Sequence, residues 1–191
     1  MALINVASRE IHCKIVYYGT GYCGKTTNLQ YIHAHAPQQA HGDLLSIATE
    51  SERTLFFDFL PLDLGAVHGF RVRFHLYTVP GQVLYERTRL AVLNGVDGIV
   101  FVADSSPDKL EENFQSVIEL ESNMRKAGKS LGDFPFVMQW NKRDLPGAIP
   151  TATLDRYLNR RRVEAFSASA ITGEGVFPTL RAICKAVMGR L

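Results

Sequence analysis

The chain has 191 residues, of which 46% are hydrophobic and 21% charged, and its 21 Lys and Arg against 19 Asp and Glu give a net charge of +2. These proportions are typical of a globular protein, and we expect one domain over residues 1–191. So small a charge argues against a nucleic-acid-binding surface, which usually gathers many uncompensated basic residues.

Short β-rich runs alternate with longer amphipathic segments along the chain, which is typical of an α/β fold. The run 11–18 (IHCKIVYY) predicts a strand that ends at Gly19. Segment 25–35 predicts a helix that ends near Pro37. A glycine-rich loop therefore joins the first predicted strand to the first predicted helix.

Two further β-rich runs, 54–60 and 70–78, predict a hairpin. The turn-forming residues Pro61, Gly65 and Gly69 separate the two runs. We therefore expect an antiparallel edge strand in this part of the sheet.

The second half of the chain begins with the apolar run 98–104 (GIVFVAD), which predicts a parallel strand buried on both faces. Ser106 and Pro107 are suited to the N-cap and the first position of the next helix. That helix carries an apolar stripe made of Leu110, Phe114, Val117, Leu120 and Met124. Two more strands, 136–140 and 163–167, and two more helices, 151–160 and 176–191, complete the prediction. The fold class is α/β, with a mixed sheet of about six strands flanked by about five helices.

The cysteines and the N-terminus indicate the compartment. Cys13, Cys23 and Cys184 are scattered, without the spacing of a disulfide framework or a metal site. No basic and apolar signal segment opens the sequence, and no run approaches the ~18 apolar residues of a membrane span. Ala2 excludes N-myristoylation, and Cys184 lies too far from the C-terminus for prenylation. We expect a cytoplasmic protein without a direct membrane anchor.

Residues 19–26 match the pattern G-x-x-x-x-G-K-[ST] between a predicted strand and a predicted helix, which is the context that a P-loop requires. Backbone N–H groups of such a loop wrap around phosphates at a helix N-terminus. Lys25 is expected to reach the terminal phosphates and to stabilise their charge, and the Thr26 hydroxyl is expected to bind Mg²⁺. The predicted nucleotide-binding residues of this segment are Gly19, Gly21, Tyr22, Cys23, Gly24, Lys25, Thr26 and Thr27.

A P-loop alone does not distinguish ATP from GTP, but the sequence Asn-Lys-Arg-Asp at 141–144 does. Here the chain resembles the Ras-like small GTPases, in which an N-K-x-D motif selects guanine. The resemblance implies that Asp144 accepts hydrogen bonds from the base N1–H and the N2 amine, that the Lys142 stem covers the ring, and that Asn141 belongs to the same site. Adenine cannot satisfy that carboxylate, and a buried acceptor without a partner costs about 1–3 kcal/mol. The family's S-A-K base-contact loop corresponds here to Ser169, Ala170 and Ile171, with Ile in place of Lys.

The third strand of most Ras-like proteins ends in D-x-x-G-Q, whereas this chain has Thr-Val-Pro-Gly-Gln at 78–82. The resemblance implies that Gly81 donates its N–H to the γ-phosphate and that Gln82 orients the attacking water. The missing Asp normally holds Mg²⁺ through a water. We take Asp58, on the neighbouring predicted strand, as the candidate substitute, with a solvated strand aspartate as the alternative.

Thr54 stands where the family has its switch I threonine, whose hydroxyl binds Mg²⁺ only when a γ-phosphate is present. The alternative is an ordinary β-branched residue that begins a strand. Arg53 beside it is predicted to supply an arginine finger from within the chain, with a surface ion pair as the alternative.

The T-V-P-G-Q variant, together with E-R-T-L-F-F-D-F-L-P-L at 52–62 and F-H-L-Y-T at 74–78, is similar to one branch of the superfamily, the bacterial mutual-gliding-protein (MglA-type) polarity GTPases. The resemblance covers the whole chain and implies a single Ras-like P-loop G domain that hydrolyses GTP to GDP with Mg²⁺. It further implies a switch that collects at a cell pole and controls gliding machinery or type IV pili. Its implied partners are an activating protein of the Roadblock class and polarity or motility effectors.

Two other functions are compatible with parts of this sequence. Because the switch II Asp is missing, a scaffold that binds GTP with negligible hydrolysis stays open as the alternative. A P-loop small-molecule kinase would need adenine selectivity, against which residues 141–144 argue.

Overall fold

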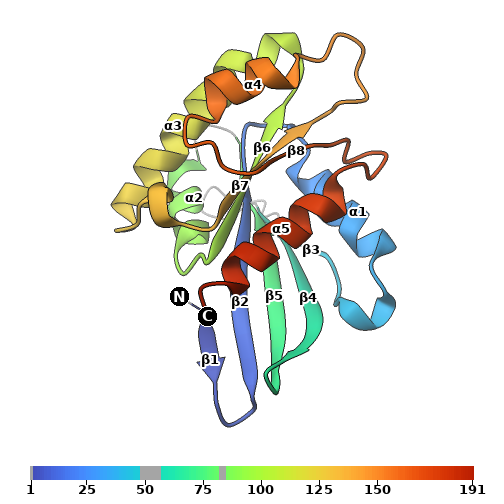
Figure 1. The fold of residues 1–191 in the computed structure, drawn as a ribbon, viewed down its shortest axis with the longest axis vertical. Coiled ribbons are helices and arrows are strands. Elements are labelled where there is room, and N and C mark those ends of the chain that lie inside the picture. Colours follow the sequence, from blue (N-terminus) through green and yellow to red (C-terminus); the bar gives the residue numbers. More distant parts are fainter. Residues whose placement is uncertain (1, 48–56, 82–84) are drawn as a thin grey trace.

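The structure is a computed structural model that describes residues 2–47, 57–81 and 85–191. Within these residues one twisted sheet of eight strands forms the centre of the molecule, and helices cover both of its faces (Figure 1). The strands are β1 (Leu3–Asn5), β2 (Glu10–Tyr18), β3 (Leu45–Ile47), β4 (Phe57–Val67), β5 (Phe70–Thr78), β6 (Gly98–Asp104), β7 (Phe136–Asn141) and β8 (Ala165–Ser167).

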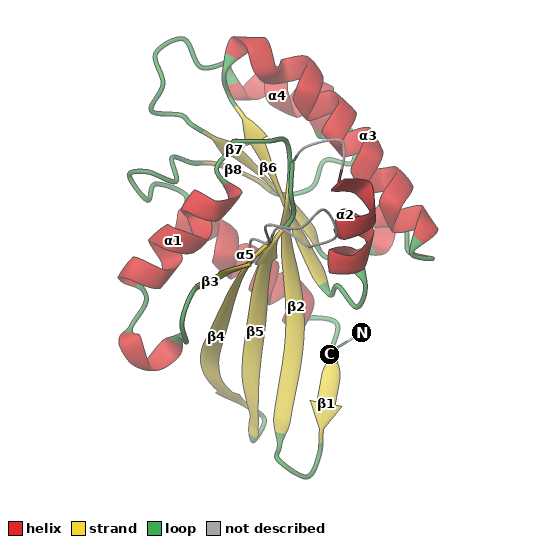
Figure 2. Cartoon of the chain, turned by 180° about the vertical axis from the view of Figure 1, so that it is seen from behind, coloured by secondary structure: helices red, strands yellow, loops and turns green. Residues whose placement is uncertain are grey.

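The helices pack on the two faces of the sheet through their apolar residues. They are α1 (Lys25–His35), α2 (Glu86–Leu93), α3 (Leu110–Lys126), α4 (Thr151–Leu158) and α5 (Val176–Met188), with short 3₁₀ turns at Gln38–Ala40, Pro107–Lys109 and Leu131–Asp133. One core cluster joins α1 and α5 to the sheet, and a second joins α2, α3 and α4 to the opposite face. Figure 2 shows the molecule from the side of α2 and α3. In the described part of the chain, no helix combines the length and apolarity needed to cross a bilayer.

The sheet is mixed, as the sequence predicts. Its order is β3-β4-β5-β2-β6-β7-β8, and β1 pairs with β2 outside this path. The strands from β5 through β2, β6 and β7 to β8 are parallel, whereas β4 runs antiparallel to β5 and to β3. The carboxyl ends of β2, β6 and β7 therefore meet at one edge of the sheet, which is where ligands of open α/β sheets bind.

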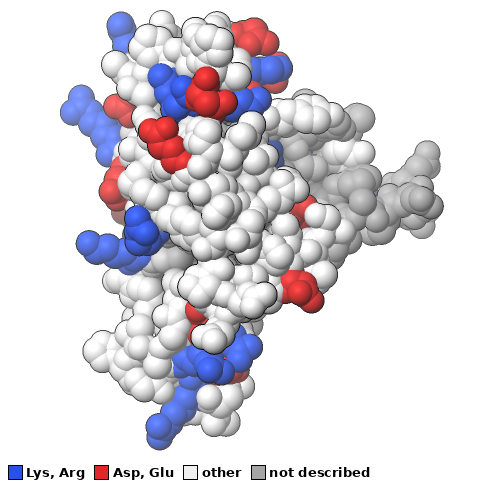
Figure 3. Space-filling view, turned by 90° about the vertical axis from the view of Figure 1, so that its right-hand side faces the viewer, with Lys and Arg blue, Asp and Glu red and all other residues white. Residues whose placement is uncertain are grey.

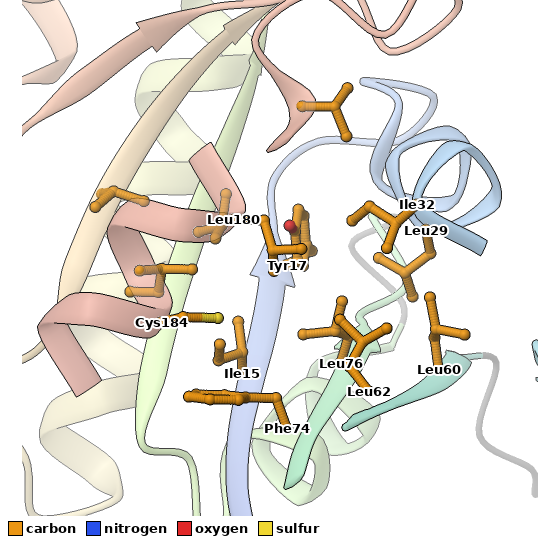
Figure 4. Close-up of a cluster of buried hydrophobic side chains, with 14 of the residues drawn as sticks. Ile15, Tyr17, Leu29, Ile32, Leu60, Leu62, Phe74, Leu76, Leu180 and Cys184 are labelled. Carbon is orange, nitrogen blue, oxygen red and sulfur yellow. The ribbon is translucent and has the colours of Figure 1, made fainter. Parts of the chain in front are cut away.

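The first core cluster lies between the sheet and the pair α1 and α5 (Figure 4). Leu29 and Ile32 of α1 are fully buried above β4 and β5. Their partners across the layer are Leu60, Leu62, Phe74 and Leu76. Since α1 begins at the end of the P-loop, this packing also fixes the loop on the sheet.

The hairpin differs from the prediction in its first strand. β4 continues through Pro61 and Gly65 to Val67, with a register shift between Asp63 and Ala66. β5 pairs with Pro61 on one side of β4, whereas β3 on the other side pairs only with residues 57–59. A proline is tolerated on that outer side because the contact there is a single hydrogen bond from the Gly42 N–H to the Pro61 carbonyl oxygen at 3.1 Å, which needs no N–H of residue 61. The prediction that Pro61 and Gly65 separate two strands is therefore wrong, and the edge strand is β3 in place of 54–60.

The start of the third helix also differs. Ser106 is the N-cap of a 3₁₀ turn, Pro107–Lys109, but its hydroxyl accepts no bond from that turn and donates to Asp104 at 2.7 Å. Of the predicted stripe only Leu120 and Met124 are fully buried, because the inner face of α3 also carries polar groups. These buried polar residues are Asn113, Ser116 and Asn123.

Charged side chains of both signs are interspersed on the face shown in Figure 3. This distribution agrees with the net charge of +2 for the whole chain.

Truncation of Leu29 tests the α1 layer. Because the side chain has no exposure, Leu29→Ala is expected to lower the free energy of unfolding by about 2–5 kcal/mol. Urea unfolding followed by circular dichroism measures the change. Leu3→Ala is the control, because Leu3 is 75% exposed and its loss should change stability by less than about 0.5 kcal/mol. Equal effects of the two substitutions would contradict the assigned packing.

Candidate functional site

The P-loop connects the carboxyl end of β2 to the first turn of α1, as the sequence predicts. A Cβ on Gly19, whose φ is +146°, would lie 2.2 Å from the Val102 carbonyl oxygen of β6. A Cβ on Gly24, whose φ is +101°, would lie 2.2 Å from Asn141 Nδ2. Both positions thus require glycine, because a neighbouring strand approaches the loop backbone.

The Lys25 ammonium turns back over this loop. Lys25 Nζ donates to the carbonyl oxygens of Gly19 at 2.9 Å and Thr20 at 2.5 Å. Tyr22, at the tip of the loop, is 88% exposed with φ +60°, whereas the Cys23 side chain is fully buried in the core. The Cys23 side chain therefore belongs to the core, whereas the Tyr22 ring stands in solvent at the tip of the loop.

Asp58 of β4 joins Thr26 at the bottom of the site. The Asp58 carboxylate accepts hydrogen bonds from the hydroxyls of Thr26 at 2.5 Å, Ser46 at 2.7 Å and Thr78 at 2.8 Å. Asp58 is 8% exposed, so it is not a solvated strand aspartate. Thr78 occupies the position of the missing switch II Asp, and the carboxylate from the next strand reaches the same place.

A cavity of about 540 Å³ lies between the P-loop, β4 and the end of β5. Gly81 closes one side of it, because a Cβ on Gly81 would lie 2.2 Å from the Gly21 nitrogen. Arg53, Thr54 and Gln82 lie outside the described residues. The predicted site residues that line the cavity are Gly21, Tyr22, Gly24, Lys25, Thr26, Thr27, Asp58 and Gly81.

Asn141, at the end of β7, joins two loops of the site. Its side-chain Nδ2 donates to the Cys23 carbonyl oxygen at 2.8 Å, and its Oδ1 accepts from the Ala170 N–H at 2.9 Å. Ser169 and Ala170 are buried, whereas Asp144 and Ile171 are exposed beside them. The structure therefore brings 141–144 and 169–171 together next to the P-loop, across 118 residues of sequence from Cys23 to Asn141.

Comparison with known proteins gives the family. The model of the ADP-ribosylation factor (Arf) family matches residues 1–187. The mutual gliding-motility protein MglA of Myxococcus xanthus (strain DK1622) is 53% identical over 191 residues, which cover 100% of this chain and 98% of that protein. The chain belongs to the Arf family of small GTPases. The predicted MglA-type resemblance and the predicted fold class are confirmed, and this Arf-family protein binds GTP and GDP and hydrolyses GTP.

Asp104, a buried acidic residue that belongs to none of the sequence motifs, adjoins the N-K-x-D motif of this Arf-family GTPase. Lys142, with φ +65°, places its Nζ 2.6 Å from Asp104 Oδ2 at the end of β6. Burial raises the pKa of Asp104, but hydrogen bonds from Lys142 and Ser106 outweigh it and leave that pKa below its usual value. The sequence feature that points to this residue is its place as the last, acidic residue of the apolar run 98–104.

This ion pair gives the Arf-family GTPase a pH-dependent contribution to stability. Because the Asp104 pKa is lowered in the folded chain, the contribution is present above the unfolded value of about 3.9 and is lost as the pH falls through the folded value. Asp104→Asn is therefore expected to reduce the loss of unfolding free energy between about pH 5 and about pH 3. Urea unfolding at both pH values measures this change in unfolding free energy. Asp133→Asn, at an exposed position, is the control. If Asp104→Asn lost as much unfolding free energy between the two pH values as the wild type does, the expectation would be refuted.

Proposed function

We propose that this GTPase is a molecular switch of cell polarity and motility, built on one G domain that spans residues 1–191. The observation that carries the proposal is the convergence of the P-loop, the Thr26–Asp58 cluster and the Asn141–Ala170 bridge at one edge of the sheet. The motility role is supported by 53% identity to a protein whose name links it to gliding motility.

The nucleotide is assigned to two groups of residues. The backbone of 19–27 surrounds the phosphates, and the Lys25 ammonium exchanges its present carbonyl partners for terminal phosphate oxygens. On the other side Asp144 accepts from the guanine N1–H and N2 amine, the Lys142 stem covers the ring, and 169–171 complete the base site. Adenine has no donors to match Asp144, which explains selectivity for guanine.

The donor set at Thr26 and Asp58 fits Mg²⁺. The ion prefers oxygen ligands and is commonly held by one or two carboxylates together with substrate phosphates. Within the described residues no group of three or more His, Cys, Asp or Glu side chains could hold a metal ion. Thr26, Asp58 and, in the GTP state, Thr54 are the proposed metal residues. When bound, Mg²⁺ neutralises charge on the phosphates.

Hydrolysis is assigned to residues that surround the γ-phosphate. Gln82 orients a water for in-line attack, and the Gly81 N–H donates to the γ-phosphate. Lys25 stabilises the charge that develops on the leaving oxygens, and Arg53 supplies the arginine finger from within the chain. Gly81 adjoins the P-loop backbone, which supports this assignment.

The proposed partners are an activating protein of the Roadblock class and effectors of polarity or motility. The relative in Myxococcus xanthus supports a motility role. We propose a cytoplasmic protein that concentrates at a cell pole through these partners.

Single-turnover hydrolysis of GTP tests the switch. The wild-type chain is expected to form GDP faster with an activating protein of the Roadblock class than alone. Gln82→Ala is expected to slow hydrolysis by about 10²-fold, because the water loses its orienting group. Gln115→Ala, on the exposed face of α3, is the control. If the wild type formed no GDP under either condition and Gln82→Ala changed nothing, the chain would be a GTP-binding scaffold.

The magnesium dependence of GDP retention tests Asp58. Asp58→Asn keeps the shape of the side chain but removes its charge, so half-maximal retention of GDP should require about tenfold more Mg²⁺. Release of a fluorescent GDP over a Mg²⁺ titration measures it. Asp63→Asn is the control on the same strand, where Asp63 pairs with Arg71 at 3.1 Å. An unchanged titration in Asp58→Asn would remove Asp58 from the metal site.

A further inference from the structure

A chain of side-chain hydrogen bonds runs through the core between α1 and α5, which lie on the same face of the sheet (Figure 1). Asn28 Nδ2 donates to the Gly24 carbonyl oxygen and to Gln139 Oε1, each at 2.9 Å. Gln139 Nε2 returns a bond to Asn28 Oδ1 at 3.0 Å and donates to Thr179 Oγ1 at 3.1 Å. Thr179 in turn donates to the Gly175 carbonyl oxygen at 2.7 Å. We call Asn28, Gln139 and Thr179 the buried relay.

All three side chains of the buried relay are fully buried. Val137, two residues before Gln139 on β7, belongs to the apolar cluster that also contains Leu29 and Leu180. Within this layer each amide oxygen and nitrogen of the relay has a partner. A polar chain so complete has no capacity left for a ligand, so its role is to join elements.

The relay ends on the two glycines that begin the helices of the nucleotide site. Gly24 is the N-cap of α1 and Gly175 the N-cap of α5, both with positive φ. At the α5 end, the Ser169 N–H donates to the Glu174 carbonyl oxygen at 2.9 Å, and the Gly173 N–H donates to the Ser169 oxygen at 2.8 Å. The relay is thus linked to the base-contact loop at one end and to the P-loop at the other.

The relay also lies beside the Asn141 bridge. Gln139 and Asn141 are two residues apart on β7, so their side chains point to the same face of the sheet. Asn141 connects Cys23 to Ala170 at the ligand edge, and the relay connects Gly24 to Gly175 one layer deeper. Two parallel connections therefore set the separation of the same pair of loops.

We propose that Asn28, Gln139 and Thr179 are positioning residues that hold the phosphate-binding loop and the base-contact loop at the separation that one GDP molecule spans. The inference rests on the proposed function, in which 19–27 bind the phosphates and 169–171 the base. A ligand that contacts two sites at once gains affinity only where their geometry allows simultaneous contact. Loss of the relay thus weakens binding of the whole nucleotide and spares a ligand that uses the P-loop alone.

The experiment compares GDP with inorganic pyrophosphate on the full chain. Gln139→Leu keeps the volume of the side chain but removes its hydrogen bonds to the Asn28 amide and the Thr179 hydroxyl, which keep only their bonds to Gly24 and Gly175. We expect GDP to dissociate about tenfold faster, which corresponds to about 1.4 kcal/mol. The dissociation constant of pyrophosphate, measured by calorimetry, should stay within about twofold.

Two further variants separate positioning from stability. The exchange Asn28→Gln with Gln139→Asn restores an amide pair and should return GDP dissociation to within about threefold of wild type. Asn123→Leu is the matched control, since buried Asn123 donates to the Tyr18 hydroxyl at 3.1 Å on the other face of the sheet. It should lower the melting temperature and leave GDP dissociation unchanged.

The outcomes are distinct. GDP dissociation within about twofold of wild type in folded Gln139→Leu, or an equal loss for GDP and pyrophosphate, overturns the inference. If Gln139→Leu does not fold, Thr179→Val removes only one hydroxyl, and the same two measurements decide. A wild-type chain that bound no GDP would overturn the proposed function as well, whereas GDP binding by the wild type with no effect of the variants overturns the inference alone.

Discussion

The site depends on the buried side-chain amide of Asn141. It accepts from the Ala170 N–H and donates to the Cys23 carbonyl oxygen, so one residue at the end of β7 bonds to both loops. The loop it contacts has no space for another side chain, since a Cβ on Gly24 would overlap the same amide. Gly24 and Asn141 therefore constrain each other, because a larger side chain at either position would displace the other residue. The remaining features of the site, from the P-loop to the exposed Asp144, are arranged around this contact.

The replacement of the switch II acid follows from strand pairing. Thr78 ends β5, and Phe59 of β4 pairs with Tyr77, so Asp58 lies next to Thr78 across the antiparallel pair. A carboxylate on the neighbouring strand can reach the space that a carboxylate on β5 would occupy, and the Thr78 hydroxyl donates to it at 2.8 Å. Under the proposed function, Asp58 takes over the acidic group that the D-x-x-G pattern places on β5. We therefore propose that the negative charge comes from a different strand and is not lost.

Local signals in the sequence predicted the P-loop, α1, β6 and β7, because each has a residue pattern that does not depend on distant partners. The sequence also placed Thr26 and Asp58 in one candidate site. It did not predict β1, β3 or α2, of which the two strands are only three residues long and form by pairing with a neighbour. The course of β4 through Pro61 could not be predicted, since it depends on how far β3 extends. The Lys142–Asp104 pair and the buried relay join residues 38 and 111 positions apart, and no pattern within one segment carries such information.

The two sides of the proposed site stand on different helices, α1 and α5, so the core that joins these helices also affects ligand binding. In the proposed site the phosphate side rests on α1 and the base side on α5, and both helices pack into one apolar cluster with the sheet. Any ligand that bridges the two sides favours the folded arrangement of that cluster, so nucleotide binding and stability are linked by mass action. The coupling is reciprocal, since whatever loosens the layer between α1 and α5 lowers the affinity for a molecule that must contact both sides.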